Sequence, residues 1–229
     1  EIYQCDWSSD VCSSDLHEAV VLGSADRGAT WSVEYRAPNA QDSLLDVIAL
    51  DAGHVIAIGA YGLCLESLDE GKTWQRRRLI ADDLHFNRIT RGPTGELYIA
   101  GERGTLLRSR DNGSQWQTLK APYEGSFYGI LPLDRRTLLA YGLRGRLFRS
   151  SDDGETWRPV ETAVEGLLAA GLQLRGNLIL LGGSVRGLLV SRNYGETFAP
   201  LAASPVGAVS ALLQLPDGSV LSLGEDGVV

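Results

Sequence analysis

Short runs that alternate apolar and polar residues divide most of the chain into repeated units. In one unit, the run Leu44–Leu50 is followed by a turn at 51–53, by His54–Ala60 and by Leu63–Ser67. A fourth run covers Thr73–Leu79. Runs of this length, rich in aliphatic and β-branched residues and separated by turn residues, are typical of β-strands joined by hairpins. The pattern predicts four antiparallel strands in each unit.

Later units repeat this layout, with corresponding runs that begin at Glu96, Thr137 and Asn177. Helical periodicity is absent except in Val164–Leu174, which we interpret as a loop and strand because it aligns with Phe127–Leu133. Four strands in about 40–45 residues is the size of a β-propeller blade. We therefore predict an all-β fold over 17–229, a propeller of four-stranded antiparallel blades.

Both ends of the chain read as parts of blades. Glu18–Ser24 matches a third strand without the first two, and Leu223–Val229 matches the start of another third strand. The sequence thus holds the end of one blade, four whole blades and the start of a sixth unit, about five blades' worth. We expect an open arc, truncated at both ends, from a ring of about six to eight blades. The alternative is that the two partial blades pair and close a five-bladed ring.

An eight-residue box recurs at one place in each unit. The boxes read SADRGATW, SLDEGKTW, SRDNGSQW, SSDDGETW and SRNYGETF, and their starts are separated by 43, 42, 41 and 41 residues. Position three is acidic or Asn, position five is Gly and position eight is aromatic. These residues are Asp26, Gly28 and Trp31; Asp69, Gly71 and Trp74; Asp111, Gly113 and Trp116; Asp152, Gly154 and Trp157; and Asn193, Gly195 and Phe198.

Turn chemistry explains this composition. An Asp at the third position can accept hydrogen bonds from following backbone amides, and a Gly at the fifth can adopt a positive φ. A calcium loop of the EF-hand type would instead need an acidic residue at the twelfth position. The residues there are Tyr35, Arg78, Lys120, Glu161 and Ala202. We therefore predict that the boxes are structural hairpin turns, with no metal and no catalytic role, and we expect no cofactor.

The first sixteen residues change the meaning of the composition. The stretch DWSSDVCSSDL, Asp6–Leu16, back-translates to a short-read sequencing adapter, so we interpret 1–16 as non-native and expect it to be disordered. It contains 4 of the 29 acidic residues and none of the 21 basic ones, which leaves 25 against 21 and a net charge of −4. This mildly acidic balance argues against nucleic-acid binding. No apolar run approaches the roughly 20 residues of a membrane span.

The boxes resemble the Asp-box, or bacterial neuraminidase repeat, of sialidases, some endoglucanases and sortilin-type receptors. Their combination with an upstream G-x-x-G-x-L-x-x-S pattern resembles the photosynthesis system II assembly and stability factor family more closely. The pattern reads GAYGLCLES from Gly59, GERGTLLRS from Gly101 and GLRGRLFRS from Gly142, while GSVRGLLVS from Gly183 departs by one residue. The resemblance implies an extracytoplasmic propeller that binds a protein or peptide partner during assembly or export of a membrane-protein complex.

One rim of the propeller offers a candidate binding surface. In an antiparallel meander, the second-to-third-strand turns share a rim with the connections between blades, away from the boxes. Arg103, Arg144 and Arg186 occupy one place in three successive turns, and Tyr61 and Asp226 occupy it in the flanking units. An arc of guanidinium groups could hold a carboxylate or an acidic peptide. The alternative is that each arginine is solvated and independent.

A glycoside hydrolase is the competing hypothesis. Asp82, Asp83 and Glu124 lie on the same rim and could act as a carboxylate pair, together with the polar His85 and Tyr123. Loop carboxylates are common, however, and an isolated solvated role is the simpler interpretation. A sialidase would need an R-I-P motif, and the nearest match, Arg88-Ile89-Thr90, lacks the proline.

Three further features have structural interpretations. The run Gln75–Leu79 is expected to be a solvated outer strand, with a contact surface as the alternative. His54 and Cys64 are expected to be ordinary strand residues, because no His/Cys spacing indicates zinc. The sequence therefore favours a non-enzymatic propeller scaffold that binds a protein or peptide.

Overall fold

The computed structural model describes residues 11–13, 19–26, 28–39, 41–185, 187–202 and 207–228. Its strands form six separate antiparallel sheets. The first sheet contains β1 (Val11–Ser13), β2 (Val20–Gly23) and β3 (Ser32–Arg36). Blade 1 contains β4 (Leu44–Ala49), β5 (Val55–Gly59), β6 (Cys64–Ser67) and β7 (Gln75–Arg76). Blade 2 contains β8 (Phe86–Arg91), β9 (Leu97–Gly101), β10 (Leu106–Ser109) and β11 (Gln117–Thr118).

The later sheets repeat this arrangement. Blade 3 contains β12 (Phe127–Pro132), β13 (Leu138–Gly142), β14 (Leu147–Ser150) and β15 (Arg158–Pro159). Blade 4 contains β16 (Leu168–Gln173), β17 (Ile179–Gly183), β18 (Leu189–Ser191) and β19 (Ala199–Pro200). The last sheet contains β20 (Val209–Gln214), β21 (Val220–Gly224) and β22 (Gly227–Val228). Four 3₁₀ turns lie between strands: η1 (Asp51–Gly53), η2 (Ala60–Gly62), η3 (Leu143–Gly145) and η4 (Arg175–Asn177).

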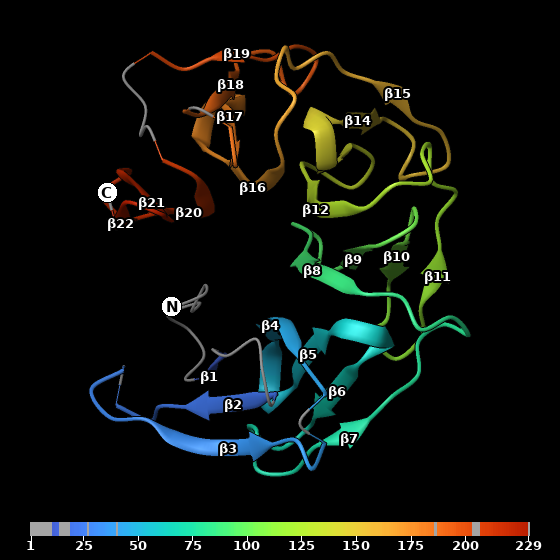
Figure 1. Cartoon of the computed structure of the whole chain (residues 1–229), viewed down its shortest axis with the longest axis vertical. Coiled ribbons are helices and arrows are strands. Elements are labelled where there is room, and N and C mark those ends of the chain that lie inside the picture. The colour runs from blue at the N-terminus through green and yellow to red at the C-terminus, as the bar shows by residue number, and fades with distance from the viewer. Residues whose placement is uncertain are drawn as a thin grey trace.

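The sheets follow one another around a central space, with β4, β8, β12, β16 and β20 innermost (Figure 1). Each complete blade runs outward in sequence order, and every strand pairs with the next. The predicted all-β propeller of four-stranded antiparallel blades is confirmed. Among the described strands, no pairing joins the first sheet to the last, so these two sheets do not merge into one blade.

The strand β1 lies within the segment 1–16, for which the sequence analysis expects disorder. Val11–Ser13 pair with Val21–Gly23 of β2, while the rest of this segment lies outside the described residues, so the expectation stays a prediction. Among the described residues, this sheet has no inner strands of the kind that precede the corresponding strand in the complete blades. The edge of β2 that such a strand would cover presents unpaired backbone N–H and C=O groups, which a nearby extended segment can satisfy.

Every inner strand carries a β-bulge at the same place. The register shifts between Leu44 and Asp46 in β4 and between Phe86 and Arg88 in β8, and equivalent shifts occur in β12, β16 and β20. A bulge bends its strand and re-aims the side chain that follows it. The residue after the bulge lines the central pocket in β4, β8, β16 and β20, and among these it is charged only in blades 1 and 2.

The hydrophobic core lies between neighbouring blades. Tyr98 and Leu106 of blade 2 form one buried cluster with Phe127 and Leu138 of blade 3, and Trp157 packs against its edge. The other described clusters repeat this arrangement between the other sheets. Each blade thus buries its apolar faces against its neighbours, as in repeat architectures whose units are stabilised by contacts between them.

The first glycine of the G-x-x-G pattern is required by a close backbone approach. A Cβ atom at Gly59 would lie 1.9 Å from the carbonyl oxygen of Ser43, and one at Gly101 would lie 2.3 Å from that of His85. Such distances are impossible for a side chain, so only glycine allows the connection to enter the inner strand here.

Each box closes its own hairpin through a serine and an aspartate. In the second box, the Asp69 carboxylate accepts hydrogen bonds from the Ser67 hydroxyl (2.9 Å), the Thr73 amide (2.8 Å) and the Thr73 hydroxyl (2.6 Å). The Gly71 amide donates to Ser67 Oγ (2.9 Å), and the Trp74 indole donates to the Gly71 carbonyl (2.7 Å). The boxes at Ser24 and Ser150 repeat this set of bonds.

The fifth box shows that an amide can replace the carboxylate. Asn193 Oδ1 accepts the Ser191 hydroxyl (3.0 Å) and the Thr197 amide (3.0 Å), as the aspartates do. Its Nδ2 donates to the Thr197 hydroxyl oxygen (2.9 Å), which reverses the direction of the bond that the aspartates accept. The box geometry therefore requires a planar polar group and does not require a charge.

In the third, fourth and fifth boxes, the fourth residue links the box to the preceding blade. Its backbone has a positive φ, as at Asn112 (57°), Asp153 (64°) and Tyr194 (60°). The Asn112 amide lies 3.0 Å from the His54 ring nitrogen of blade 1, and the Tyr194 hydroxyl donates to Asp134 of blade 3 (2.7 Å). The boxes therefore hold neighbouring blades together as well as closing their own hairpins.

Asp153 makes the most extensive of these links, to blade 2. The buried Arg108 guanidinium donates to the Asp153 backbone carbonyl (2.6 Å) and lies 2.8 Å from its carboxylate. The Tyr98 hydroxyl donates to the same carboxylate (3.2 Å), and the exposed Arg110 also pairs with it. One buried and one exposed arginine thus share a single acidic partner.

We expect low pH to destabilise the protein through its boxes. Hydrogen bonds from Thr and Ser hold the pKa of Asp26 at about 2 and lower the pKa values of Asp69 and Asp152, and the Gln115 amide and the Ser109 hydroxyl lower that of Asp111. A lowered folded-state pKa gives stability that is present above the unfolded pKa of about 4 and is lost as pH falls. Urea denaturation over a pH series should show this decline, and it should be shallower when Asp69, Asp111 and Asp152 are replaced by Asn. An equally steep decline in the Asn variant would contradict this account.

We expect Arg108→Ala to lower the free energy of unfolding by about 3 kcal/mol, because it leaves a partly buried carboxylate without its buried partner. Arg110→Ala is the matched control, since it removes an exposed arginine from the same carboxylate and should cost about 0.5 kcal/mol or less. Chemical denaturation measures both variants. Equal effects would show that the blade link does not depend on the buried arginine.

Candidate functional site

The rim opposite the boxes, which we call the connection rim, is built from second-to-third-strand turns and blade connections. Each turn is hydrogen-bonded to the connection that leaves its own blade. The Gly62 amide donates to Leu84 O (2.8 Å), the Gly104 amide to Gly125 O (2.9 Å) and the Gly145 amide to Gly166 O (2.6 Å). These bonds fix the tips of the turns relative to the connections beside them.

The residues at the tips of these turns are held in one backbone conformation. Tyr61, Arg103 and Arg144 have φ values of 54°, 50° and 58°. All three side chains are exposed. The arginines make no hydrogen bond or ion pair with any side chain that the structure describes, so their guanidinium groups are available to a ligand. Arg186 lies outside the described residues.

The ring of Tyr61 packs against a neighbouring side chain. It is 63% exposed, and its ring meets the ring of His85 edge-on with 4.7 Å between centroids. Glu102 accepts a hydrogen bond from the His85 amide (3.0 Å) and lies 3.6 Å from Nδ1 of the same residue. The exposed tyrosine and the half-buried histidine and glutamate thus form one group that spans the boundary between blades 1 and 2.

The candidate catalytic carboxylates do not form a pair. Asp82 and Asp83 lie on the connection between blades 1 and 2, and Glu124 lies on the next connection. All three are exposed, and Asp83 lies 3.5 Å from Arg78. Within the described part of the chain, no hydrogen bond joins Glu124 to either aspartate. An exposed carboxyl lacks the apolar surroundings that keep a general acid protonated at neutral pH.

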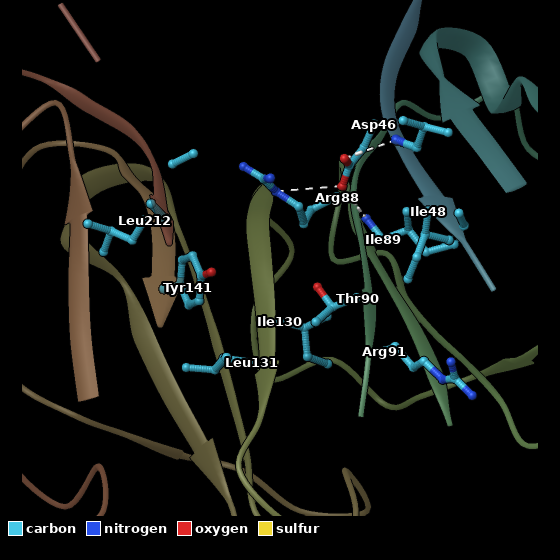
Figure 2. Close-up of a pocket in the computed structure, with 15 residues that line it drawn as sticks. Asp46, Ile48, Arg88, Ile89, Thr90, Arg91, Ile130, Leu131, Tyr141 and Leu212 are labelled. Atoms are coloured by element: carbon cyan, nitrogen blue, oxygen red, sulfur yellow. Dashed lines mark hydrogen bonds and ion pairs between the residues drawn. The ribbon is translucent and has the colours of Figure 1, made fainter. Parts of the chain in front are cut away.

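The central space contains a pocket of about 260 Å³ that the inner strands line (Figure 2). Arg88 enters it from β8 and donates to the carbonyl oxygens of Ala169 (3.3 Å) and Ser210 (3.4 Å) on the far side. Its Nε lies 3.7 Å from Asp46, whose carboxylate also accepts the backbone amides of Ile89 (2.8 Å) and Val47 (3.0 Å). Arg88 therefore connects blades 1 and 2 to the inner strands of blade 4 and the last sheet.

Burial dominates the titration of the groups in this pocket. It raises the pKa of Asp46 above its ordinary value, although the Arg88 charge and two backbone amides oppose the shift. Burial also raises the pKa of Tyr141 to about 12, so its hydroxyl stays protonated at neutral pH. The Tyr141 ring occupies space next to Gly129 and Gly171, where a Cβ atom would lie 2.4 and 2.7 Å from the hydroxyl oxygen.

This arrangement explains why Arg88 fails as a sialidase-like substrate arginine. A buried carboxylate pairs with its charge, and its guanidinium donates to backbone carbonyl groups on the opposite side of the propeller. The role of the Arg88–Asp46 pair is to cross-link inner strands. Sequence reasoning missed Asp46 and Tyr141, because an isolated acidic or aromatic residue in a predicted strand gives no local signal of a partner in another blade.

The basic run that begins in the outer strand β7 is paired with groups of its own chain. Arg76 pairs with Asp42 (3.2 Å), and Arg77 pairs with Glu66 (3.0 Å) while donating to the Gly113 and Ser114 carbonyls of the next blade. Arg78 donates to the Ile80 and Ala81 carbonyls. These arginines thus bind their own chain and leave few donors for a partner.

Three further observations bear on metal binding, thiol chemistry and membrane association. The described residues contain no group of three or more His, Cys, Asp or Glu side chains placed to hold a metal ion. Cys64 is buried, and burial raises the pKa of its thiol to about 12, which disfavours the reactive thiolate. In the described part of the chain, no helix has the length and apolar character needed to cross a membrane.

The repeated boxes and radial four-stranded sheets define an Asp-box β-propeller. The model of the family described as photosynthesis system II assembly factor YCF48 matches residues 24–228. This chain belongs to that family. None of the curated proteins matches the chain.

Solved structures share the fold. One titled "YCF48 bound to D1 peptide" has a TM-score of 0.62 and 21% identity, and the match covers 80% of this chain and 60% of that one. YCF48 from Cyanidioschyzon merolae has a TM-score of 0.62 and 16% identity, with 82% and 65% covered. An ancestral GH74 enzyme has a TM-score of 0.64 and 16% identity, with 79% of this chain and 27% of that chain covered. The chain therefore spans about two thirds or less of each of these structures.

We expect Arg88→Met to lower the free energy of unfolding by about 3 kcal/mol at neutral pH, because Asp46 then lies buried without a counter-charge. A carboxyl with a raised folded-state pKa stabilises the fold most below its unfolded pKa, and that stability is lost as pH rises. The loss should therefore be smaller at about pH 5 than at about pH 8. Denaturation of Arg88→Met and of Arg88→Met with Asp46→Asn tests this, since the second change should restore much of the stability.

Proposed function

We propose that the protein is a non-enzymatic scaffold that binds a protein or peptide segment on its connection rim. The observation that carries this proposal is the exposure of Arg103 and Arg144 at equivalent turn tips, fixed in one backbone conformation and without partners among the described side chains. A guanidinium group with free donors suits a carboxylate, which it can bind through two parallel hydrogen bonds. Arg186 lies outside the described residues, and we include it in the proposed arc because its sequence position matches those of Arg103 and Arg144.

Family membership supports a protein partner. A structural neighbour from the same family is titled as bound to a D1 peptide. We infer that this chain likewise binds a segment of a partner protein, within the assembly or export of a membrane-protein complex. We further infer an extracytoplasmic location, periplasm or lumen, from membership of the family.

The geometry favours binding over hydrolysis. A glycosidase needs two carboxyl groups that flank one sugar at a set separation. Asp82 and Asp83 lie on one connection and Glu124 on another, and all three face solvent. The resemblance to an ancestral GH74 enzyme reflects the shared propeller fold. No observation at this rim favours a glycosidase.

We expect replacement of Arg103, Arg144 and Arg186 by Ala to reduce binding of a D1-type carboxylate-bearing peptide at least about tenfold, because charge-assisted donors are lost. The melting temperature should change little, since Arg103 and Arg144 are exposed. Fluorescence anisotropy with the labelled peptide measures the affinity.

The matched control is the triple replacement of Arg135, Arg175 and Arg192 by Ala. These arginines are also exposed, but they lie on first-to-second-strand turns and in a box, on the opposite rim. It removes the same charge from the protein and should leave binding nearly unchanged. Equal loss of affinity in both triple variants would show a non-specific charge effect, and undiminished binding in the first would exclude the arc.

A further inference from the structure

The connection rim differs in chemistry between blade 1 and the two blades that follow. Blade 1 presents the Tyr61 ring at the place where blades 2 and 3 present Arg103 and Arg144. All three residues have nearly the same φ, so the backbone does not distinguish them. The difference is therefore one of side chain alone, on a surface of otherwise repeated geometry.

The Tyr61 ring is positioned for contact with a ligand. It is 63% exposed, although its backbone is held by the hydrogen bond from Gly62 to Leu84 (2.8 Å) and its ring by the edge of His85. His85 is in turn fixed by Glu102, which accepts its backbone amide. An aromatic ring that is both exposed and restrained loses little conformational entropy on binding, a property of residues that dominate interfaces.

The charges around this ring are mainly acidic. Asp82 and Asp83 lie on the connection that packs against the Tyr61–Gly62 turn, where a Cβ atom at Gly62 would lie 3.4 Å from Asp82 O. Glu102 joins them through His85. Two arginines lie beside them: Arg78, 3.5 Å from Asp83, and Arg103, which follows Glu102 in the chain. The three carboxylates therefore exceed the two guanidinium groups by one negative charge, and charge complementarity favours a cation at this end of the rim.

We propose that Tyr61, with Asp82 and Glu102, forms a subsite for a lysine or arginine side chain of the partner segment. The inference rests on the proposed function of the connection rim and adds a second specificity to it. A cation over the face of a tyrosine is attracted by the ring quadrupole, and neighbouring carboxylates strengthen that attraction. The cationic subsite in blade 1 and the anion-binding arginines in blades 2 and 3 then fix the direction in which a mixed-charge segment lies along the rim.

The test uses synthetic peptides of one length on a Gly-Ser background, with graded spacers between charged positions. One series carries only two aspartates, a second adds one lysine on the side that reaches blade 1, and a third has norleucine in place of that lysine. A fourth carries the lysine on the opposite side. Fluorescence anisotropy should show the lysine series binding about fivefold more tightly than the norleucine series, and more tightly than the reversed series.

Three variants locate the effect. Tyr61→Phe keeps the ring and should keep the preference for lysine, whereas Tyr61→Leu should lose most of it. Tyr61→Arg should reverse it, and it should fold because arginine adopts this backbone conformation at positions 103 and 144. Leu68→Ala is the control, since Leu68 is 69% exposed but lies in a box, on the opposite rim.

The outcomes separate this inference from the proposed function. Failure of every peptide to bind would overturn the peptide-binding role of the rim, and the subsite with it. Binding of the aspartate-only series with no preference for lysine over norleucine would overturn the subsite alone. A preference for lysine that survives Tyr61→Leu would also overturn it, because the cation would then be held elsewhere.

Discussion

The structure depends on a short network of hydrogen bonds that closes each outer hairpin. A serine hydroxyl and a planar side-chain group satisfy the amides of a turn whose fourth and fifth residues both have positive φ. That conformation aims the fourth side chain at the preceding blade, where Asn112, Asp153 and Tyr194 find their partners. Local turn chemistry therefore determines how neighbouring blades are joined, and a blade without its box would lose both kinds of contact.

The side chains on the two rims therefore have different structural roles. On the box rim, the side chains of Asn112, Asp153 and Tyr194 are engaged with the adjacent blade, so a change there alters stability. On the connection rim, the turns are fixed by backbone hydrogen bonds between glycine amides and carbonyl groups. The tip side chains are not needed to hold that geometry, and their identity can vary between tyrosine and arginine without changing the fold. This separation of structural and variable positions suits a surface that recognises a partner.

The repeats explain how much of the structure could be predicted from sequence. Strand number, hairpin positions and the boxes follow from local patterns that recur five times, and the tryptophan position follows with them. The sequence also indicated which turns would share a rim, because an antiparallel meander alternates its ends. The cross-ring contact of Arg88 with Ala169 and Ser210 could not be found in this way, since it joins residues 81 and 122 positions apart and occurs once.

The partners of the charged run that begins in the outer strand also could not be predicted from the sequence. Here the fold removes a candidate binding surface that the sequence offered. Arg76, Arg77 and Arg78 look like an exposed basic run in the sequence, yet the fold supplies each with an acceptor from its own chain. Arg103 and Arg144 are isolated in the sequence, yet the fold brings them to equivalent exposed tips without a described partner. Charge density along the chain is therefore a poor guide to binding here. Whether an arginine can serve a partner depends on whether its own fold already satisfies its donors.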